Sequence, residues 1–211
     1  MIIMEQRTLS IAGALIELKL LEKRINRATN SSFVSVKKGK ELPAGYKDVN
    51  EVENAIKGNY QSVLDLIELR NTIKSKIVIS NANTEVTVGS KKMTVAEAIE
   101  RKTSIEHEKA LLGALKADFR KVSTELVRHN EQVKAKANAL AESFLGRDTD
   151  KTVVAEAQAL SESHYSSNEG KLIDPIGIVK AIEDLEHSIE EFESNVDLAL
   201  TVSNAKVEIT I

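Results

Sequence analysis

The chain has 211 residues, with 29 Lys and Arg against 32 Asp and Glu, no cysteine, no tryptophan and few aromatic side chains. The lack of cysteine excludes disulfides, thiol catalysis and Cys-ligated zinc, and a net charge of −3 gives no reason to expect nonspecific nucleic-acid binding. The N-terminus has no basic leader, and no apolar run reaches the roughly 18 residues of a membrane span, so we expect a cytoplasmic protein without a membrane partner.

Residues 8–28 carry apolar side chains at helical spacing and predict a first helix. Its last turns are basic and polar, which either offsets the helix dipole or contacts a ligand. Residues 29–48 break the periodicity with Gly39, Pro43 and Gly45, and the alternation in 33–36 predicts a short strand. The lysines at 37, 38 and 40 fit a solvated turn or an anion contact.

A second helix is predicted from about residue 48 to 79, because apolar side chains recur every three or four positions. The stripe comprises Val52, Ile56, Val63, Leu66, Ile67, Ile73 and Ile77. If Arg70 shares this inward stripe, its guanidinium must find a carboxylate, a carbonyl or a ligand, since an unpaired buried charge is costly.

Residues 81–105 organise the chain, because a hairpin pattern there leads into a long helix. Residues 85–88 and 92–94 alternate around Gly89 and Ser90, which predicts a β-hairpin. Thr94 precedes Glu97 by three positions, the spacing of a capping box. An isolated hairpin is marginally stable, so we expect it to pack on another subunit's hairpin, on 33–36 or on a terminal strand.

The long helix that follows has an apolar residue at every seventh position and a length of about 45–50 residues, enough for a coiled coil. The row is Ala98, Ile105, Leu112, Phe119, Leu126, Val133 and Leu140. We expect this helix to end near residues 146–148, a shorter helix over 152–163 and a loop over 164–170.

Asp174 and Pro175 predict the capped start of a last helix over about 175–200. Its two apolar rows are Ile178, Leu185, Phe192 and Ala199, and Ile182, Ile189 and Val196. They form a coiled-coil seam for the long helix, for a second subunit or for both. Residues 206–211 alternate like a strand that can complete the hairpin's sheet.

These elements predict a mainly α fold, an elongated helical bundle or coiled coil with a small β-hairpin element. We expect one helical domain over 1–211, with β structure near 33–36, 85–94 and 206–211. The two long seams predict a homo-oligomer.

No catalytic pattern accompanies the helices. The four histidines occur singly, no pair has metal-site spacing, and the glycine pattern of a phosphate loop is missing. The acidic pairs near the chain's end fit a solvent face. We therefore expect no enzyme, no metal and no cofactor.

Three parts of the chain carry a resemblance: residues 9–27, the hairpin with Val88-Gly89 and Met93–Arg101, and the final helix. In these parts the chain resembles the septicolysin-like family of small helical proteins. It also resembles uncharacterised phage proteins in which a Ser-Asn-Ala segment, a hairpin and Thr-Val-Ala-Glu-Ala-Ile open the long helix.

The phage resemblance implies two competing functions. One is a homo-oligomeric sponge in the host cytoplasm that sequesters a nucleotide-derived immune signal, a cyclic nucleotide or an ADP-ribose derivative, as an anti-defence protein. The other is a structural or assembly protein without a small ligand, and a septicolysin-type toxin is a weaker third hypothesis. We favour the sponge, because basic and amide residues concentrate at the junctions of helices and hairpin, and keep the structural protein as the alternative. For the sponge, the expected ligand-binding residues are Arg24, Asn26, Arg27, Arg70, Asn71, Lys74, Asn81, Asn83 and Arg101, since guanidinium and amide groups suit phosphate, ribose and base edges.

Overall fold

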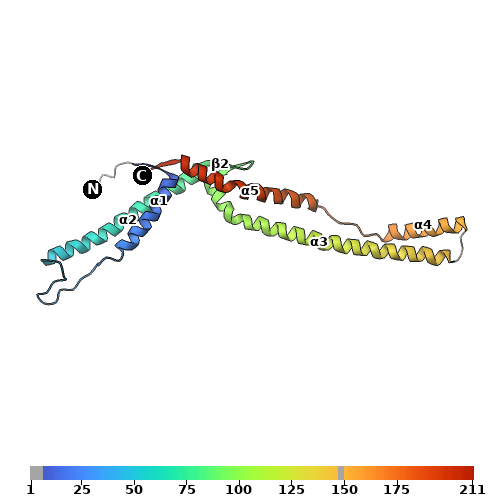
Figure 1. The fold of residues 1–211 in the computed structure, drawn as a ribbon, viewed down its shortest axis with the longest axis horizontal. Coiled ribbons are helices and arrows are strands. Elements are labelled where there is room, and N and C mark those ends of the chain that lie inside the picture. The colour runs from blue at the N-terminus through green and yellow to red at the C-terminus, as the bar shows by residue number, and fades with distance from the viewer. Residues whose placement is uncertain (1–6, 147–149) are drawn as a thin grey trace. The chain divides into compact units, whose positions relative to one another are not determined.

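The computed structural model describes residues 7–146 and 150–211 and confirms a mainly α fold with two small antiparallel sheets (Figure 1). In chain order the elements are β1 (Thr8–Ser10), α1 (Ile11–Ala28), α2 (Val49–Asn83), β2 (Glu85–Val88), β3 (Lys91–Thr94), α3 (Val95–Leu145), α4 (Lys151–Asn168), α5 (Ile178–Lys206) and β4 (Glu208–Thr210). The contacts define two compact units. Unit 1 holds the residues up to Thr103 and Glu191–Ile211, and unit 2 holds Ser104–Glu190; the single domain over 1–211 stays a prediction.

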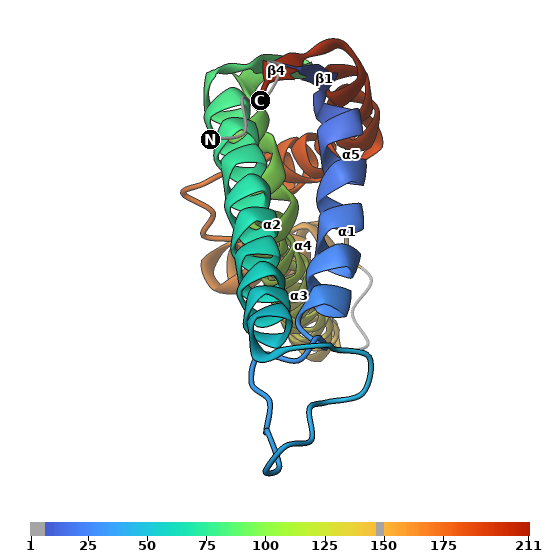
Figure 2. The same ribbon diagram turned by 90° about the vertical axis from the view of Figure 1, so that its left-hand side faces the viewer.

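In unit 1, α1 and α2 lie side by side and are joined by the loop of residues 29–48 (Figure 2). Apolar side chains at spacings of three and four meet between them and are buried. This core comprises Ile11, Ala14, Leu18, Leu21, Ile73, Ile77 and, from β4, Ile209. Full burial of a Leu or Ile side chain contributes roughly 1.5–3 kcal/mol, so this core holds the two helices together.

Side-chain caps determine where α1 and α2 begin. The Ser10 hydroxyl accepts a hydrogen bond from the Gly13 amide at 3.1 Å, which starts α1 at Ile11 rather than at residue 8. The Asp48 carboxylate accepts from the Glu51 amide at 2.9 Å, and the Glu51 carboxylate accepts from the Lys47 amide at 2.8 Å. These bonds satisfy amides that have no partner within the helix.

The two strands near the chain ends pair with each other. β1 is antiparallel to β4, with Leu9 opposite Ile209, and the pairing continues to Arg7 and Ile211. The expectation that the last strand completes the sheet of the hairpin is therefore wrong. Residues 8–10 were expected to be helical, but Ser10 caps α1, and its two predecessors are extended and pair with β4.

The hairpin and its capping box are confirmed. β2 and β3 pair around Gly89, which has φ +60°. The Thr94 amide donates to the Glu97 carboxylate at 2.6 Å, and the Glu97 amide donates to the Thr94 hydroxyl at 3.1 Å. The turn is held by α5, because the amide and hydroxyl of Ser90 both donate to the Glu191 carboxylate. Sequence analysis did not propose this partner.

Three loop predictions are corrected. Residues 33–36 form no strand, and the bridge in that loop joins Lys38 and Glu41 instead. Residues 164–168 continue α4 rather than forming a loop. α5 begins at Ile178, three residues after Pro175, because Gly177 has φ +66°; the Asp174 carboxylate still caps it by accepting from the Ile178 amide at 2.8 Å.

α3 has the predicted length, 51 residues, and ends at Leu145. Part of its predicted end, Arg147 and Asp148, lies outside the described residues. Ion pairs place α5 beside α3 within each unit, as the seams predicted: Lys102 with Asp197 in unit 1, and Lys116 with Glu186 in unit 2.

Candidate functional site

The nine expected ligand-binding residues all belong to unit 1 but lie at four separate places. Arg24, Asn26 and Arg27 are exposed near the end of α1; Arg70, Asn71 and Lys74 lie in the middle of α2; Asn81 and Asn83 lie at the end of α2; and Arg101 lies near the start of α3. A helix rises 1.5 Å per residue, so Arg70 and Asn83 are about 20 Å apart along α2. Arg70 and Asn83 are therefore too far apart to contact one small ligand within a chain, and the binding role of the set stays a prediction.

Arg70 occupies the inward stripe of α2, and its guanidinium forms an ion pair with a carboxylate. It lies 3.9 Å from Glu22 of α1 and donates to the Asn71 side-chain oxygen at 3.2 Å. Its side chain is 37% exposed, so the pair contributes at most about 1 kcal/mol. The position of Arg70 is thus explained by the contact between α1 and α2.

Two other members of the set make contacts within unit 1. The Arg101 guanidinium lies 4.6 Å from the ring centroid of Phe192, a cation–π contact between α3 and α5. The Asn83 amide donates to the Ile79 carbonyl at 2.9 Å, a local bond at the end of α2. Both contacts stabilise helix packing or a helix end.

A row of side chains at alternating spacings of four and three runs along α2, outside its contact with α1. We call it the outer row: Tyr60, Leu64, Ile67, Asn71, Lys74 and Val78. Its four apolar members are 36–58% exposed. A hollow of about 670 Å³ is lined by Leu64, Ile67 and Asn71 of this row. The spacing is that of a coiled-coil seam, but within the chain the row faces solvent.

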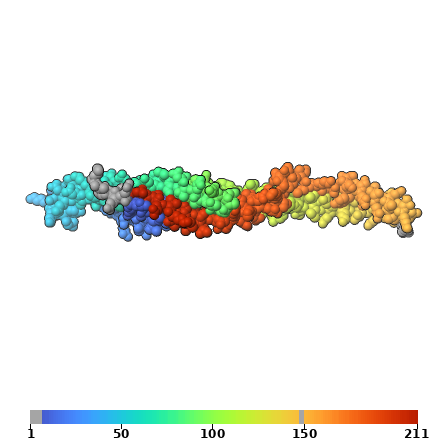
Figure 3. Space-filling model, turned by 90° about the horizontal axis from the view of Figure 1, so that it is seen from above, coloured from blue at the N-terminus to red at the C-terminus, as the bar shows by residue number. Residues whose placement is uncertain are grey.

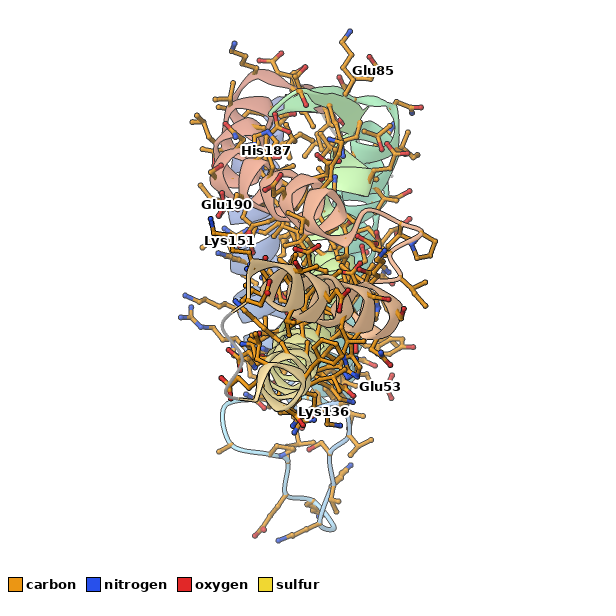
Figure 4. The ribbon with its side chains drawn as sticks, turned by 90° about the vertical axis from the view of Figure 1, so that its right-hand side faces the viewer. Glu53, Glu85, Lys136, Lys151, His187 and Glu190 are labelled. Atoms are coloured by element: carbon orange, nitrogen blue, oxygen red, sulfur yellow. The ribbon has the colours of Figure 1, made fainter. Side chains whose placement is uncertain are left out.

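A groove of about 390 Å³ lies between β2 and the C-terminal half of α5, both in unit 1. Figure 3 shows the two segments as neighbours, in green and red. Its apolar lining includes Val86, Leu198 and Val202, and its rim carries Glu85 and Lys206. In Figure 4 the labelled Glu85 side chain points away from the ribbon. One side of the groove is thus formed by residues of strand β2, and the other side by apolar side chains of helix α5.

Unit 2 has a more polar surface between α3 and α4. A hollow of about 510 Å³ there is lined by Lys134, Ala137, Asn138, Ser161, Glu162, Tyr165 and Ser166. One helical turn earlier on α3, the Asn130 amide contacts the backbone of Gly170 twice, accepting from its N–H at 2.7 Å and donating to its carbonyl at 3.2 Å. A Cβ at Gly170 would lie 2.9 Å from Leu126 Cδ1. These contacts fix the end of α4.

Two carboxylates have a lowered pKa. A hydrogen bond from the Thr94 backbone amide lowers the pKa of Glu97, and one from the Thr152 amide lowers the pKa of Asp150. Both are helix caps. Among residues 7–146 and 150–211, no three His, Cys, Asp or Glu side chains are grouped to hold a metal ion, and no described helix has the length and hydrophobicity to cross a bilayer.

Comparison with known proteins gives no relative. No family model matches the chain, and neither a curated protein nor a solved structure is similar to it.

Sequence reasoning missed both apolar surfaces of unit 1. It placed Ile67 in the inward stripe, whereas the structure places it in the outer row, 36% exposed. The signal was present, because Tyr60, Leu64 and Ile67 already show the spacings of four and three. No sequence pattern indicated the groove, because β2 and the part of α5 that lines it are about 110 residues apart in the chain and are brought together only by the tertiary fold.

Proposed function

We propose that this chain is a homo-oligomeric structural or assembly protein whose subunits join along the outer row of α2. The observation that carries the proposal is the row itself: four apolar side chains in coiled-coil spacing, 36–58% exposed, on a helix whose other face is already buried against α1. Exposed apolar side chains gathered on one surface, as at Tyr60, Leu64 and Ile67, mark interaction sites in proteins.

The polar members of the outer row fit the same role. Asn71 and Lys74 interrupt an otherwise apolar seam, and a single polar residue at such a position selects the register and the number of helices. Two residues expected to bind a ligand thus have a second role, specifying which helix pairs with α2.

The proposal is tested with Ile67→Asp in the full chain. Wild-type protein is expected to sediment as an oligomer at micromolar concentration. The variant is expected to sediment as a folded monomer, because a carboxylate enters the seam without touching the core. Ser62→Asp is the matched control, since Ser62 is exposed on the same helix and lies neither in the outer row nor in the lining of the hollow beside it. A monomeric wild type, or equal behaviour of the two variants, contradicts the proposal.

Sequestration of a nucleotide-derived signal stays a prediction with a separate test. Native mass spectrometry of the purified protein, with thermal shifts for cyclic nucleotides and ADP-ribose derivatives, measures whether any ligand is bound. If a ligand binds, Arg101→Ala is expected to lower its affinity more than Glu190→Gln, which alters a carboxylate on α5 of unit 2. Equal effects contradict the residue set.

A further inference from the structure

β2 has an edge whose backbone groups are directed away from β3. The hairpin register pairs Val88 with Lys91 across a two-residue turn and Val86 with Met93, and the Val95 amide donates to Thr84 at 2.8 Å. In such a ladder, alternate residues point their N–H and C=O groups outward. For β2 these residues are Glu85 and Thr87. In the described part of the chain, no strand pairs with this edge.

The two edges of the hairpin differ in charge. β3 begins with Lys91 and Lys92, and lysines on an edge strand oppose pairing with another strand. β2 has the sequence Glu-Val-Thr-Val, with one charge and two β-branched apolar residues. Only the β2 edge is chemically suited to accept a further strand.

The surface beyond that edge is apolar. Leu198 and Val202 of α5 line the groove beside β2 and are 67% and 41% exposed. A strand paired with β2 would lie about 4.8 Å from it and would cover these two side chains. Glu85 and Lys206 lie on the rim, one acid and one base, so the groove has no net charge to repel a copy of itself.

We propose that β2 of a second copy occupies this groove, antiparallel to the first β2, with the twofold axis at Val86. The inference rests on the proposed self-assembly and adds a second contact to it. Only this register lets both outward residues of β2 form hydrogen bonds with the outward residues of the second β2. Glu85 then lies opposite Thr87 of the second copy, and Thr87 lies opposite its Glu85. Charge also favours it: the single acidic residue of each strand faces a threonine rather than its own copy.

A single engineered cysteine tests the axis, because the chain has no cysteine of its own. In this register the two Val86 residues face each other as a non-hydrogen-bonded pair with Cα atoms about 4.5 Å apart, which suits a disulfide. Val86→Cys is expected to become a covalent dimer with glutathione disulfide as oxidant. Met93→Cys, its cross-strand neighbour on β3, is the control and is expected to stay uncrosslinked. Equal crosslinking of both variants, or none with Val86→Cys, overturns the proposal.

Proline substitution tests the strand edge by a second route. Thr87→Pro removes an outward N–H without breaking a bond inside the hairpin, and Lys92→Pro does the same on the β3 edge. By symmetry the first change removes two intersubunit hydrogen bonds, and it is expected to weaken the β2 contact at least about tenfold in sedimentation. Lys92→Pro is expected to leave the contact unchanged.

The outcomes separate this contact from the proposed function. An oligomer lost with Ile67→Asp but unchanged by Thr87→Pro overturns the β2 contact alone, and a wild-type monomer overturns both. If the groove binds an extended peptide of another protein while Val86→Cys gives no crosslink, pairing between copies is also wrong.

Discussion

Unit 1 and unit 2 differ in what holds their helices together. In unit 1, Leu21 and Ile73 are fully buried between α1 and α2, and β4 adds Ile209 to the same core. In unit 2, the heptad row of α3 is buried at Ile105 and Val133 but only half-buried at Leu112, Phe119 and Leu126 between them, and α4 contributes the small Ala157 as a buried residue. Regular heptad spacing thus predicts a helix and its apolar face, but not whether that face is covered within the same chain.

The largest expected effect is in the core of unit 1. Ile73→Ala removes a fully buried side chain, and we expect it to lower the free energy of unfolding by about 2–5 kcal/mol. Urea unfolding measures the loss, and hydrogen exchange localises it to α1 and α2. Ser75→Ala, an exposed change on the same helix, is the control. A loss below about 1 kcal/mol at Ile73 would place the core elsewhere.

The next effect concerns the polar contacts of unit 2. Asn130→Ala leaves the N–H and carbonyl of Gly170 without their partner, which costs about 1–3 kcal/mol. Amide exchange is expected to accelerate in residues 169–177 and not in α1. Asn138→Ala, two turns further along α3 and exposed, serves for comparison and is expected to change stability by less than about 0.5 kcal/mol.

A smaller effect is expected in the heptad row itself. Leu126→Ala in α3 shortens a half-buried side chain, and we expect a loss of about 1 kcal/mol in urea unfolding. A loss as large as that of Ile73→Ala would contradict the contrast between the units and would mean that another subunit covers this row.

The smallest effect is a pH dependence at the start of α3. Because the folded-state pKa of Glu97 is lowered, mainly by the Thr94 backbone amide, its contribution is complete above the unfolded pKa of about 4.3 and is lost as pH falls through the folded value. Glu97→Gln is expected to reduce the loss of thermal stability on acidification to pH about 3. The control is Glu142→Gln, an exposed change near the end of α3, which is expected to behave like wild type. If the pH dependence of thermal stability were unchanged in Glu97→Gln, the cap would not titrate.

Local signals predicted most of the helical fold. Periodicity placed α2, α3 and α5, and the spacing of Thr94 and Glu97 located the start of α3, because capping depends on neighbours in sequence. The same locality explains the errors. Alternation in 33–36 produced no strand, since none of the strands among the described residues pairs with it. The start of α1 was set by Ser10 rather than by the apolar pattern.

The candidate surfaces depended on contacts that sequence does not encode locally. The basic and amide residues that suggested a pocket lie at four places, and Arg70 is explained by Glu22 on another helix. The exposure of individual apolar side chains also depended on the fold. Ile67 and Ile73 are equally apolar, but Ile73 is buried against α1 whereas Ile67 faces solvent.

The pairing of β1 with β4 has a consequence for synthesis of the chain. Leu9 meets Ile209, which the ribosome adds 200 positions later. At about 5–20 residues per second, α1 waits some 10–40 s for its final partner. During that interval the side of the core that Ile209 covers stays open, and closing so long a loop is entropically slow. We therefore expect the nascent α1–α2 pair to expose apolar core surface until β4 has been synthesised.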